Sequence, residues 1–295
     1  MNLSKLGSTR AWCLQASPVL ICGLERSGTS MLQVALARHP ALFDVADVYE
    51  TFAFAQPAKL LEAPAPTMVK AYLRGRDEAW RAHVQALRAG GPALSEADLV
   101  RAFFHFCATE VYPGRQPLEK TPAHVQHLQQ ALELFPRARV LVCTRDPVSV
   151  VASYRKRLAK EQSLGKPRSD WGWLDRSADQ LLSHFERISA HLQAAQRRWP
   201  EQVFVAPYDW LTDAPEAALR EVCAFAGLPW HDAVLRPADV GGRVDELLSQ
   251  PITRREADDA RFVDEATAAQ IRQRTAAHRT LWDTPGLVPA PVAAT

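Results

Sequence analysis

The residues with the clearest chemistry lie at the end of an apolar run that stops at Gly23. Two glycines, Gly23 and Gly28, have four residues between them, and Thr29 and Ser30 follow. Between a strand and a helix, this spacing is typical of a phosphate-binding loop, because backbone N–H groups and a helix N-terminus both attract an anion. A nucleoside triphosphate loop has lysine directly after the second glycine, where this chain has Thr29. The only positive charge within the loop is Arg26, so an anion site unlike that of an ATPase is predicted.

A second candidate anion site follows another apolar run, at 139–144. Arg145 comes directly after this run, and Ser153 follows eight residues later, within a predicted helix. Residues at the carboxyl ends of parallel strands face the ligand crevice, so Arg145 is placed to meet a second phosphate. Ser153, two turns into the helix, can face the same crevice and donate its hydroxyl. Pairing of Arg145 with Asp146, or helix capping by Arg145, stays open as the alternative. Two separated anion sites indicate a ligand with two separated phosphates.

The elements that must position these residues alternate along the chain. Strands are predicted for the run ending at Gly23 and for 139–144 and 203–206, and 43–54 is predicted as a loop or irregular strand. Helices are predicted over 29–38, 77–89, 95–112, 122–135, 147–158, 175–199, 215–226 and 265–282. Continuous apolar strands alternating with helices favour an α/β fold: a central parallel sheet with helices on both faces, in a P-loop-like three-layer sandwich.

Length and composition favour one domain over residues 1–295. We expect a core at 17–232, a C-terminal lid or helical extension at 233–284, and a flexible tail at 285–295. The 35 basic and 33 acidic residues give a net charge of +2, which argues against a nucleic acid partner. Five separated cysteines without metal-ligand spacing are typical of the buried, reduced thiols of a cytoplasmic protein. The apolar runs are too short for a membrane span or a signal peptide, and an oligomer stays open.

Four stretches together resemble the sulfotransferases that use 3′-phosphoadenosine 5′-phosphosulfate (PAPS). The loop from Gly23 to Ser30 resembles the family's 5′-phosphosulfate loop, usually Gly-x-Pro-Arg-Ser-Gly-Thr-Thr, and Val140 to Ser153 resembles its 3′-phosphate strand and helix. Glu119-Lys-Thr-Pro122 is similar to an element of the bacterial and carbohydrate branches. Tyr208-Asp-Trp-Leu211, with the stretch at 219–230, resembles the Tyr-Glu-Asp-Leu and Gly-Leu-Pro elements. The resemblance covers about residues 17–232.

The sequence departs from this pattern in two places. Glu25 replaces the usual proline of the loop, at a position that we expect to point outward. The family often closes over the 3′-phosphate with a C-terminal basic segment, for which only 241–243 and 254–255 could serve here.

The resemblance implies PAPS as co-substrate, adenosine 3′,5′-bisphosphate (PAP) as product, and no metal. A sulfuryl group carries less charge than a phosphoryl group, so a magnesium ion and the missing lysine are dispensable. The residues implied for binding the sulfuryl donor are Arg26, Ser27, Gly28, Thr29, Ser30, Arg145, Ser153 and Tyr208. Arg26 would also neutralise the charge that develops on the bridging oxygen.

The general base is implied to be an acid shortly after the first helix of the core. Glu50, followed by the aromatics Phe52 and Phe54, fits this position, and Asp47 is its rival. Plain solvation of both acids in a loop is the third interpretation. Lys120 either meets the sulfuryl or phosphate oxygens or pairs with Glu119.

Two tryptophans, Trp171 and Trp173, lie in the polar, basic segment 160–174. They predict a flap over the site, or else they anchor the following helix in the core. With Phe52 and Phe54, they favour an aromatic-lined acceptor site.

The function that we expect is sulfuryl transfer to a hydroxyl or amine of a small-molecule, lipid or carbohydrate acceptor. A P-loop kinase that needs Mg²⁺-ATP is the first alternative, and the missing lysine argues against it. A non-catalytic nucleotide-binding module is the second alternative.

Overall fold

The computed structural model describes residues 2–45, 50–61, 75–89, 94–236, 246–253 and 259–287. The strands are β1 (Val19–Gly23), β2 (Leu42–Asp44), β3 (Gln116–Lys120), β4 (Arg139–Thr144), β5 (Val203–Pro207) and β6 (Gly286–Leu287). The α-helices are α1 (Asn2–Gln15), α2 (Thr29–Leu36), α4 (Asp77–Arg88), α5 (Glu96–Phe106), α6 (Leu128–Leu134), α7 (Pro147–Ser163), α8 (Arg168–Trp171), α9 (Ala178–Arg198), α10 (Tyr208–Asp213), α11 (Pro215–Phe225), α12 (Glu265–Thr275) and α13 (Arg279–Asp283). Short 3₁₀ or π segments are η1 (Pro57–Leu60), η2 (Cys107–Val111), η3 (Pro122–His127), η4 (Gly172–Leu174), η5 (Asp232–Leu235), η6 (Glu246–Ser249), η7 (Asp259–Arg261) and η8 (Ala276–His278).

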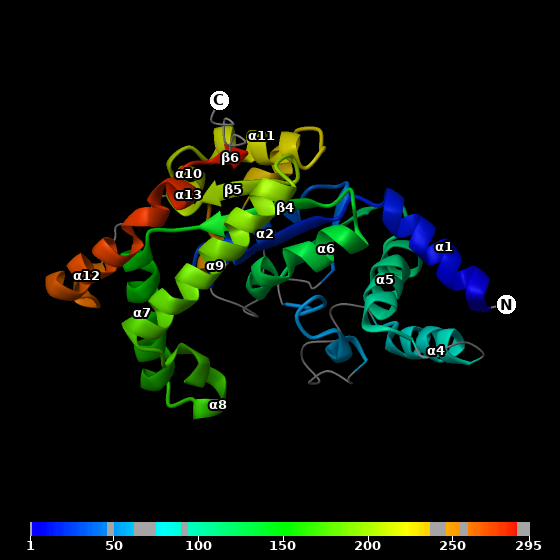
Figure 1. The fold of residues 1–295 in the computed structure, drawn as a ribbon, viewed down its shortest axis with the longest axis horizontal. Coiled ribbons are helices and arrows are strands. Elements are labelled where there is room, and N and C mark those ends of the chain that lie inside the picture. The colour runs from blue at the N-terminus through cyan, green and yellow to red at the C-terminus, as the bar shows by residue number, and fades with distance from the viewer. Residues whose placement is uncertain are drawn as a thin grey trace.

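The strands form one sheet in the order β2-β3-β1-β4-β5-β6. Neighbours from β2 to β5 are parallel, which confirms the predicted sheet, and β6 pairs with β5 in the antiparallel direction. In the register, Ile21 lies opposite Lys120 and Gly23 lies opposite Cys143. The carboxyl ends of β1, β3 and β4 therefore lie side by side at one edge of the sheet (Figure 1).

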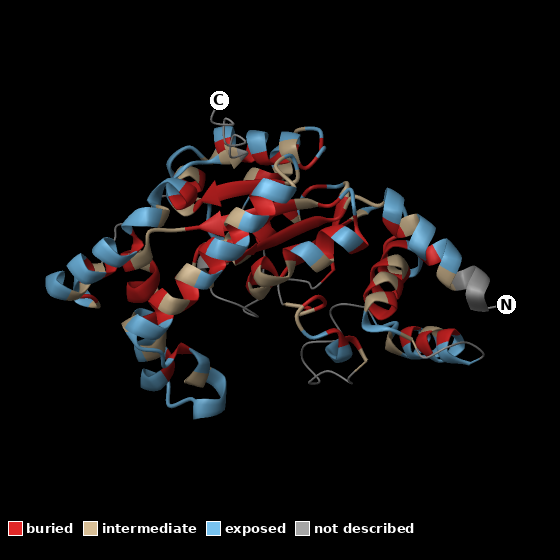
Figure 2. Ribbon diagram, viewed as in Figure 1, coloured by how far each residue is buried: buried red, intermediate tan, exposed pale blue. Residues whose placement is uncertain are grey.

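The central strands are apolar throughout because both faces of the sheet are covered. Alternate residues of a strand point to opposite faces, so every residue of β1 is buried. Figure 2 shows the strands as buried and the outer sides of the helices as exposed.

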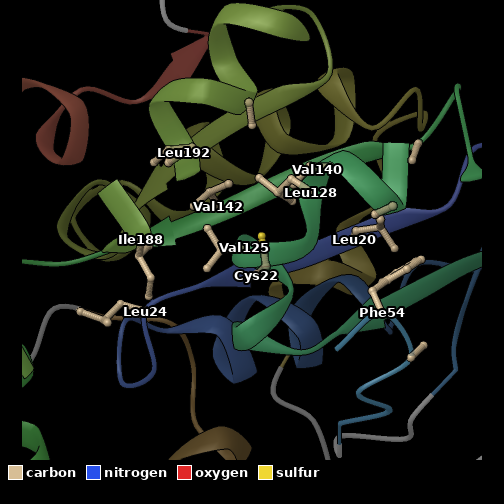
Figure 3. Close-up of a cluster of buried hydrophobic side chains, with 14 of the residues drawn as sticks. Leu20, Cys22, Leu24, Phe54, Val125, Leu128, Val140, Val142, Ile188 and Leu192 are labelled. Atoms are coloured by element: carbon tan, nitrogen blue, oxygen red, sulfur yellow. The ribbon is translucent and has the colours of Figure 1, made fainter. Parts of the chain in front are cut away.

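Two hydrophobic clusters lie between the three layers, one on each face of the sheet. On one face, residues of β1 and β4 contact η3, α6 and α9, as Figure 3 shows for Leu20, Cys22, Val125, Leu128, Val140, Val142, Ile188 and Leu192. On the other face, Ile21 and Leu141 pack with Leu32 of α2 and Leu219 of α11. The predicted three-layer α/β fold is confirmed.

The ends of the described chain differ from the predicted elements. Helix α1 was not predicted; it packs on α5, where the guanidinium of Arg10 lies 2.8 Å from a carboxylate oxygen of Asp98. The helix predicted over 265–282 is interrupted at η8, after which Trp282 stacks on Phe185 with ring centroids 4.4 Å apart. The hydroxyl of Thr144 donates to the carbonyl of Trp282 at 2.6 Å, so the C-terminal extension returns to the end of β4.

Residues 286 and 287, assigned to the tail by their composition, pair with β5 as β6, and 288–295 lie outside the described residues. In the part of the chain that the structure describes, none of the helices combines the length and apolar character that crossing a membrane requires.

Gly23 provides a direct test of how the sheet aims the loop after β1. Its φ is +136°, and a Cβ atom there would lie 2.1 Å from the carbonyl oxygen of Cys143. We expect Gly23→Ala to lower the free energy of unfolding by about 3 kcal/mol or more, measured by urea denaturation. The matched control is Gly7→Ala in α1, where the added methyl meets open space and improves helix propensity by up to about 1 kcal/mol. Equal urea midpoints for Gly23→Ala and the wild type would refute the close approach.

Candidate active site

The loop after β1 turns sharply and delivers the chain into α2. Gly28 caps the helix with a φ of +91°, and Arg26 has a φ of +71°, which is unusual for a residue with a side chain. The N–H of Ser27 donates to the carbonyl of Leu24 at 3.2 Å and closes the turn. The first N–H groups of α2 have no acceptor within the helix, so they are available to an anion at the end of β1, as predicted for a candidate site there. The backbone N–H of Ser27 is already used in the turn.

The hydroxyl of Ser27 fits a bound anion. Ser27 is fully buried, and its Oγ has no hydrogen-bond partner among the described residues. A buried hydroxyl normally has a partner, so an oxygen atom of a ligand would satisfy it. Thr29 is also buried, and Ser30 is half-buried, at the start of the same helix.

The structure brings the two predicted anion sites together. The Nε of Arg26 donates to the Oγ of Ser153 on α7 at 3.2 Å, and Nη1 of Arg145 donates to the carbonyl of Arg26 at 3.3 Å. The guanidinium of Arg145 lies over the ring of Tyr208, 4.3 Å from its centroid. The same ring packs against Gly28, where a Cβ atom would come within 2.9 Å of it. Residues that follow β1 and β4 therefore meet residues of α7 and α10 at one place.

Asp146, the alternative partner of Arg145, has another role. Its carboxylate accepts the N–H of Ser149 at 3.0 Å and caps α7, while Pro147 occupies the first turn. Arg145 itself precedes α7 and contacts Tyr208 and the loop after β1.

Lys120, at the end of β3, pairs with Glu50. Its Nζ lies 3.0 Å from Oε1 of Glu50, and the two side chains are 3% and 32% exposed. Of the two alternatives for Lys120, the pairing with Glu119 is thus replaced by a pairing with Glu50, and contact with sulfuryl or phosphate oxygens stays a prediction. Because a buried ammonium needs a partner, Glu50 is held beside β3. Asp47 lies outside the described residues, as do 241–243 and 254–255.

The side chain of Glu119 lies on the face of β3 opposite to that of Lys120, and it is fully buried. Its Oε1 accepts hydrogen bonds from the hydroxyls of Thr51 and Thr121, both at 2.7 Å, and its Oε2 lies 2.9 Å from Nδ1 of His124. Burial raises the pKa of this carboxyl, but His124 and the two threonine hydroxyls lower it and hold it below the ordinary value. Sequence reasoning missed this cluster, although the motif contains both Glu119 and Thr121.

The two aromatic residues after Glu50 lie in different surroundings. Phe52 is half-buried with a φ of +54°, and the Nζ of Lys59 lies 4.4 Å from its ring centroid. Phe54 is 1% exposed and lies in the hydrophobic core (Figure 3), against Phe104 and His124. This placement differs from the acceptor contact expected of Phe54.

The segment with two tryptophans forms the end of α7, then α8 and η4, and extends away from the sheet (Figure 1). The indole of Trp171 donates to the carbonyl of Lys166, and that of Trp173 donates to the carbonyl of Asp170. Trp173 is 47% exposed and meets the ring of Tyr154 edge-on at 5.9 Å.

Glu25 points inward, toward α9, and not outward as expected. Its Oε2 lies 3.1 Å from Nε2 of His184 and accepts the hydroxyl of Tyr154 at 3.3 Å. Burial raises the pKa of the Glu25 carboxyl, but His184 and Arg176 outweigh burial and lower it. The partners are far from Glu25 in sequence, and no local pattern indicates them.

Within the described residues, no three His, Cys, Asp or Glu side chains gather in an arrangement that could hold a metal ion. The expected absence of a metal stays a prediction.

Comparisons with known proteins agree on one family. A model described as "Sulfotransferase family" matches residues 18–232. A protein-tyrosine sulfotransferase of Drosophila melanogaster is 24% identical over 221 residues, which are 74% of this chain and 39% of that protein. This chain spans less than half the length of the curated relatives that it matches.

Solved structures share the fold. The sulfotransferase domain from the curacin biosynthetic pathway has a TM-score of 0.59 at 15% identity, covering 89% of this chain and 97% of that one. Sulfotransferase STF9 from Mycobacterium avium has a TM-score of 0.54 at 16% identity, covering 91% of this chain and 77% of that one.

The contact between Glu25 and His184 predicts a pH-dependent contribution to stability. A carboxyl whose pKa is lowered by folding stabilises the native state above its unfolded pKa, and this contribution is lost as the pH falls through the folded value. We expect Glu25→Gln to cost about 1–2 kcal/mol at pH 7, with the difference from wild type shrinking as the pH falls below about 4. Urea denaturation at several pH values measures this. Glu133→Gln, which removes an exposed partner of Arg198, is the control and should change stability by less than about 1 kcal/mol. An equal penalty at all pH values would contradict the ionic contribution.

Proposed function

Because this chain belongs to the sulfotransferase family, we propose that it transfers a sulfuryl group from PAPS to a hydroxyl or amine of an acceptor. The observation that carries the proposal is the meeting of two anion sites, where Arg26 contacts Ser153 and Arg145 contacts the loop after β1. A ligand with a 5′-phosphosulfate and a separate 3′-phosphate matches this pair of sites.

The sulfuryl donor would be held by backbone and side chains together. We assign the 5′ end to the first N–H groups of α2 and to the hydroxyls of Ser27, Thr29 and Ser30. We assign the 3′-phosphate to Arg145 and Ser153. The ring of Tyr208 lies against the Arg145 guanidinium, which restricts the orientation of this planar group and supports bidentate binding of a phosphate.

The missing lysine supports sulfuryl transfer over phosphoryl transfer. Thr29 occupies the position where a kinase loop has lysine, and the loop charge is on Arg26. A sulfuryl group carries less charge than a phosphoryl group and needs less neutralisation, so one arginine suffices and no magnesium is required. Binding of ATP with phosphorylation of a substrate would favour the kinase instead.

In the reaction, Glu50 would remove the proton from the acceptor hydroxyl or amine. The acceptor atom would form a bond to sulfur as the bond between sulfur and the bridging oxygen breaks, so PAP leaves with the bond electrons. Arg26 would stabilise the charge that develops on the leaving oxygen. Lys120 keeps Glu50 beside the end of β3. Its ammonium would contact the transferring group once Glu50 binds the acceptor.

The acceptor that we propose is a small-molecule, lipid or carbohydrate hydroxyl or amine. The name of the Drosophila relative adds a phenol hydroxyl, that of protein tyrosine, as a fourth class. Of the four aromatic residues expected at the acceptor, Phe52, Trp171 and Trp173 are partly or largely exposed and we keep them in this role, whereas Phe54 is buried and is left out. The five buried, unpaired cysteines support a reducing, cytoplasmic setting.

The two anion sites predict the effect of removing each arginine. We expect Arg145→Ala to weaken PAP binding by roughly 10–100-fold, since a charge-assisted contact to phosphate is lost, as measured by isothermal titration calorimetry. We expect Arg26→Ala to lower turnover by about 10²–10³-fold. Arg137→Ala, an exposed residue just before β4 at the opposite edge of the sheet, is the control and should leave both values unchanged. If the wild type did not bind PAP at millimolar concentration, the proposed function would be refuted.

The assignment of the base predicts a different pattern for Glu50. We expect Glu50→Gln to lower kcat by roughly 10²–10⁴-fold while PAP affinity stays within about twofold, because the carboxylate acts on the acceptor and not on the nucleotide. Sulfate transfer from labelled PAPS to an acceptor found by screening gives kcat. Glu201→Gln, exposed just before β5, is the matched control. Full activity in Glu50→Gln together with loss in Asp47→Asn would assign the base to Asp47.

A further inference from the structure

We propose that Glu119 is a positioning residue for the general base. Its buried carboxylate holds the backbone of residues 52–54 through three side chains and so fixes Glu50, which lies two residues before this segment. The role of Glu50 as base rests on the proposed function, whereas the tether itself does not.

Two of the three links run through threonine hydroxyls. Thr51 donates to Oε1 of Glu119 at 2.7 Å, and its Oγ1 accepts the N–H of Ala53 at 3.1 Å. Thr121 also donates to Oε1 at 2.7 Å, and its Oγ1 accepts the N–H of Phe52 at 3.2 Å. Each hydroxyl therefore accepts a hydrogen bond from a backbone N–H and donates one to the carboxylate, so it links the two.

The third link runs through an imidazole. The N–H of Phe54 donates to Nε2 of His124 at 3.2 Å, so Nε2 carries no proton. Nδ1 then carries the proton and donates to Oε2 of Glu119 at 2.9 Å. Three consecutive backbone N–H groups are thus linked to one carboxylate, each through one side chain. The carboxylate is the only member of this network that accepts hydrogen bonds without donating or relaying them.

The segment needs this support because its backbone is strained. Phe52 has a φ of +54°, a left-handed conformation that is unfavourable for a residue with a side chain. Its carbonyl accepts the N–H groups of Ala55 and Gln56 at 3.0 and 2.7 Å, which closes a tight turn. Such a turn persists only when its surroundings hold it, and the network around Glu119 is the buried polar contact that does so.

Consecutive residues of β3 hold the segment from two sides. Lys120 pairs with the side chain of Glu50, and Glu119 binds Thr51 on the other face of the strand. Loss of Glu119 would leave the ion pair between Lys120 and Glu50 in place. It would remove the hydrogen bonds that hold the backbone of 52–54, on which the position of Glu50 depends. A small misplacement of a catalytic group can lower turnover by up to about 10²-fold.

Glu119→Gln tests the network with almost no change in shape. An amide NH₂ donates, so it would face the N–H of His124 or a threonine hydroxyl, and at least one link would reverse or break. We expect hydrogen exchange of the peptide covering 50–56 to rise by about tenfold or more. We expect kcat to fall by roughly 10–100-fold, with the Kd of PAP within about twofold of the wild type.

The matched control is Asp98→Asn, which also removes a buried carboxylate bonded by an arginine and a hydroxyl, but on α5. It should lose stability without faster exchange at 50–56 and without the change in kcat. Thr51→Val breaks a single link and should raise exchange of the Ala53 amide, while Thr51→Ser keeps the hydroxyl and should restore protection. This pair decides the matter if Glu119→Gln fails to fold.

Unchanged exchange at 50–56 in both Glu119→Gln and Thr51→Val would overturn the positioning role. An equal fall of kcat in Asp98→Asn would also overturn it, because the effect would then reflect stability alone. If wild-type protein fails to bind PAP, the proposed function fails, and the exchange measurements still decide whether Glu119 holds the segment.

Discussion

The parallel register at one edge of the sheet is the constraint on which the candidate site depends. Gly23 lies opposite Cys143 with no room for a side chain, so β1 and β4 end at the same level. The strand pairing therefore places the loop after β1 next to Arg145, which follows β4. A hydrogen bond from Arg145 to the carbonyl of Arg26 connects them directly. The helix that follows each strand adds its own N-terminus at the same edge. The geometry of the anion sites is thus a consequence of strand pairing and needs few side chains.

Strand β3 contributes in the opposite way, through buried charge. Interior strands of a parallel sheet are normally apolar, yet β3 ends in Glu119 and Lys120, both almost completely buried. A buried charge is tolerated only when it is paired or hydrogen-bonded, and each of these residues satisfies that need on the segment at 50–54. Such buried ionic groups are weak contributors to stability, but breaking them is costly, so they fix one arrangement of the segment.

The sequence was sufficient for features that depend on local pattern. Apolar strands ending at Gly23 and Thr144, the loop up to Ser30, and the interval from Arg145 to Ser153 all follow from neighbouring residues, and the structure brings them together. Features that depend on distant partners were missed or wrong. Lys120 pairs with Glu50 and not with the adjacent Glu119, because consecutive strand residues point to opposite faces. Glu25 turns inward because His184, on a distant helix, offers it a partner. Phe54 enters the core because Phe104 and Phe135 surround it there.

This division also separates the two halves of the site physically. The half assigned to the sulfuryl donor is built from backbone turns, helix starts and two arginines held by aromatic or hydroxyl contacts. The half assigned to the acceptor is built from one strained segment whose shape depends on side chains of β3 and η3. Substitutions in the second half can therefore move Glu50 and reshape its surroundings without disturbing the loop after β1 or Arg145. Because β1 lies between β3 and β4 and pairs with both, it is the common element of both halves and keeps them in register.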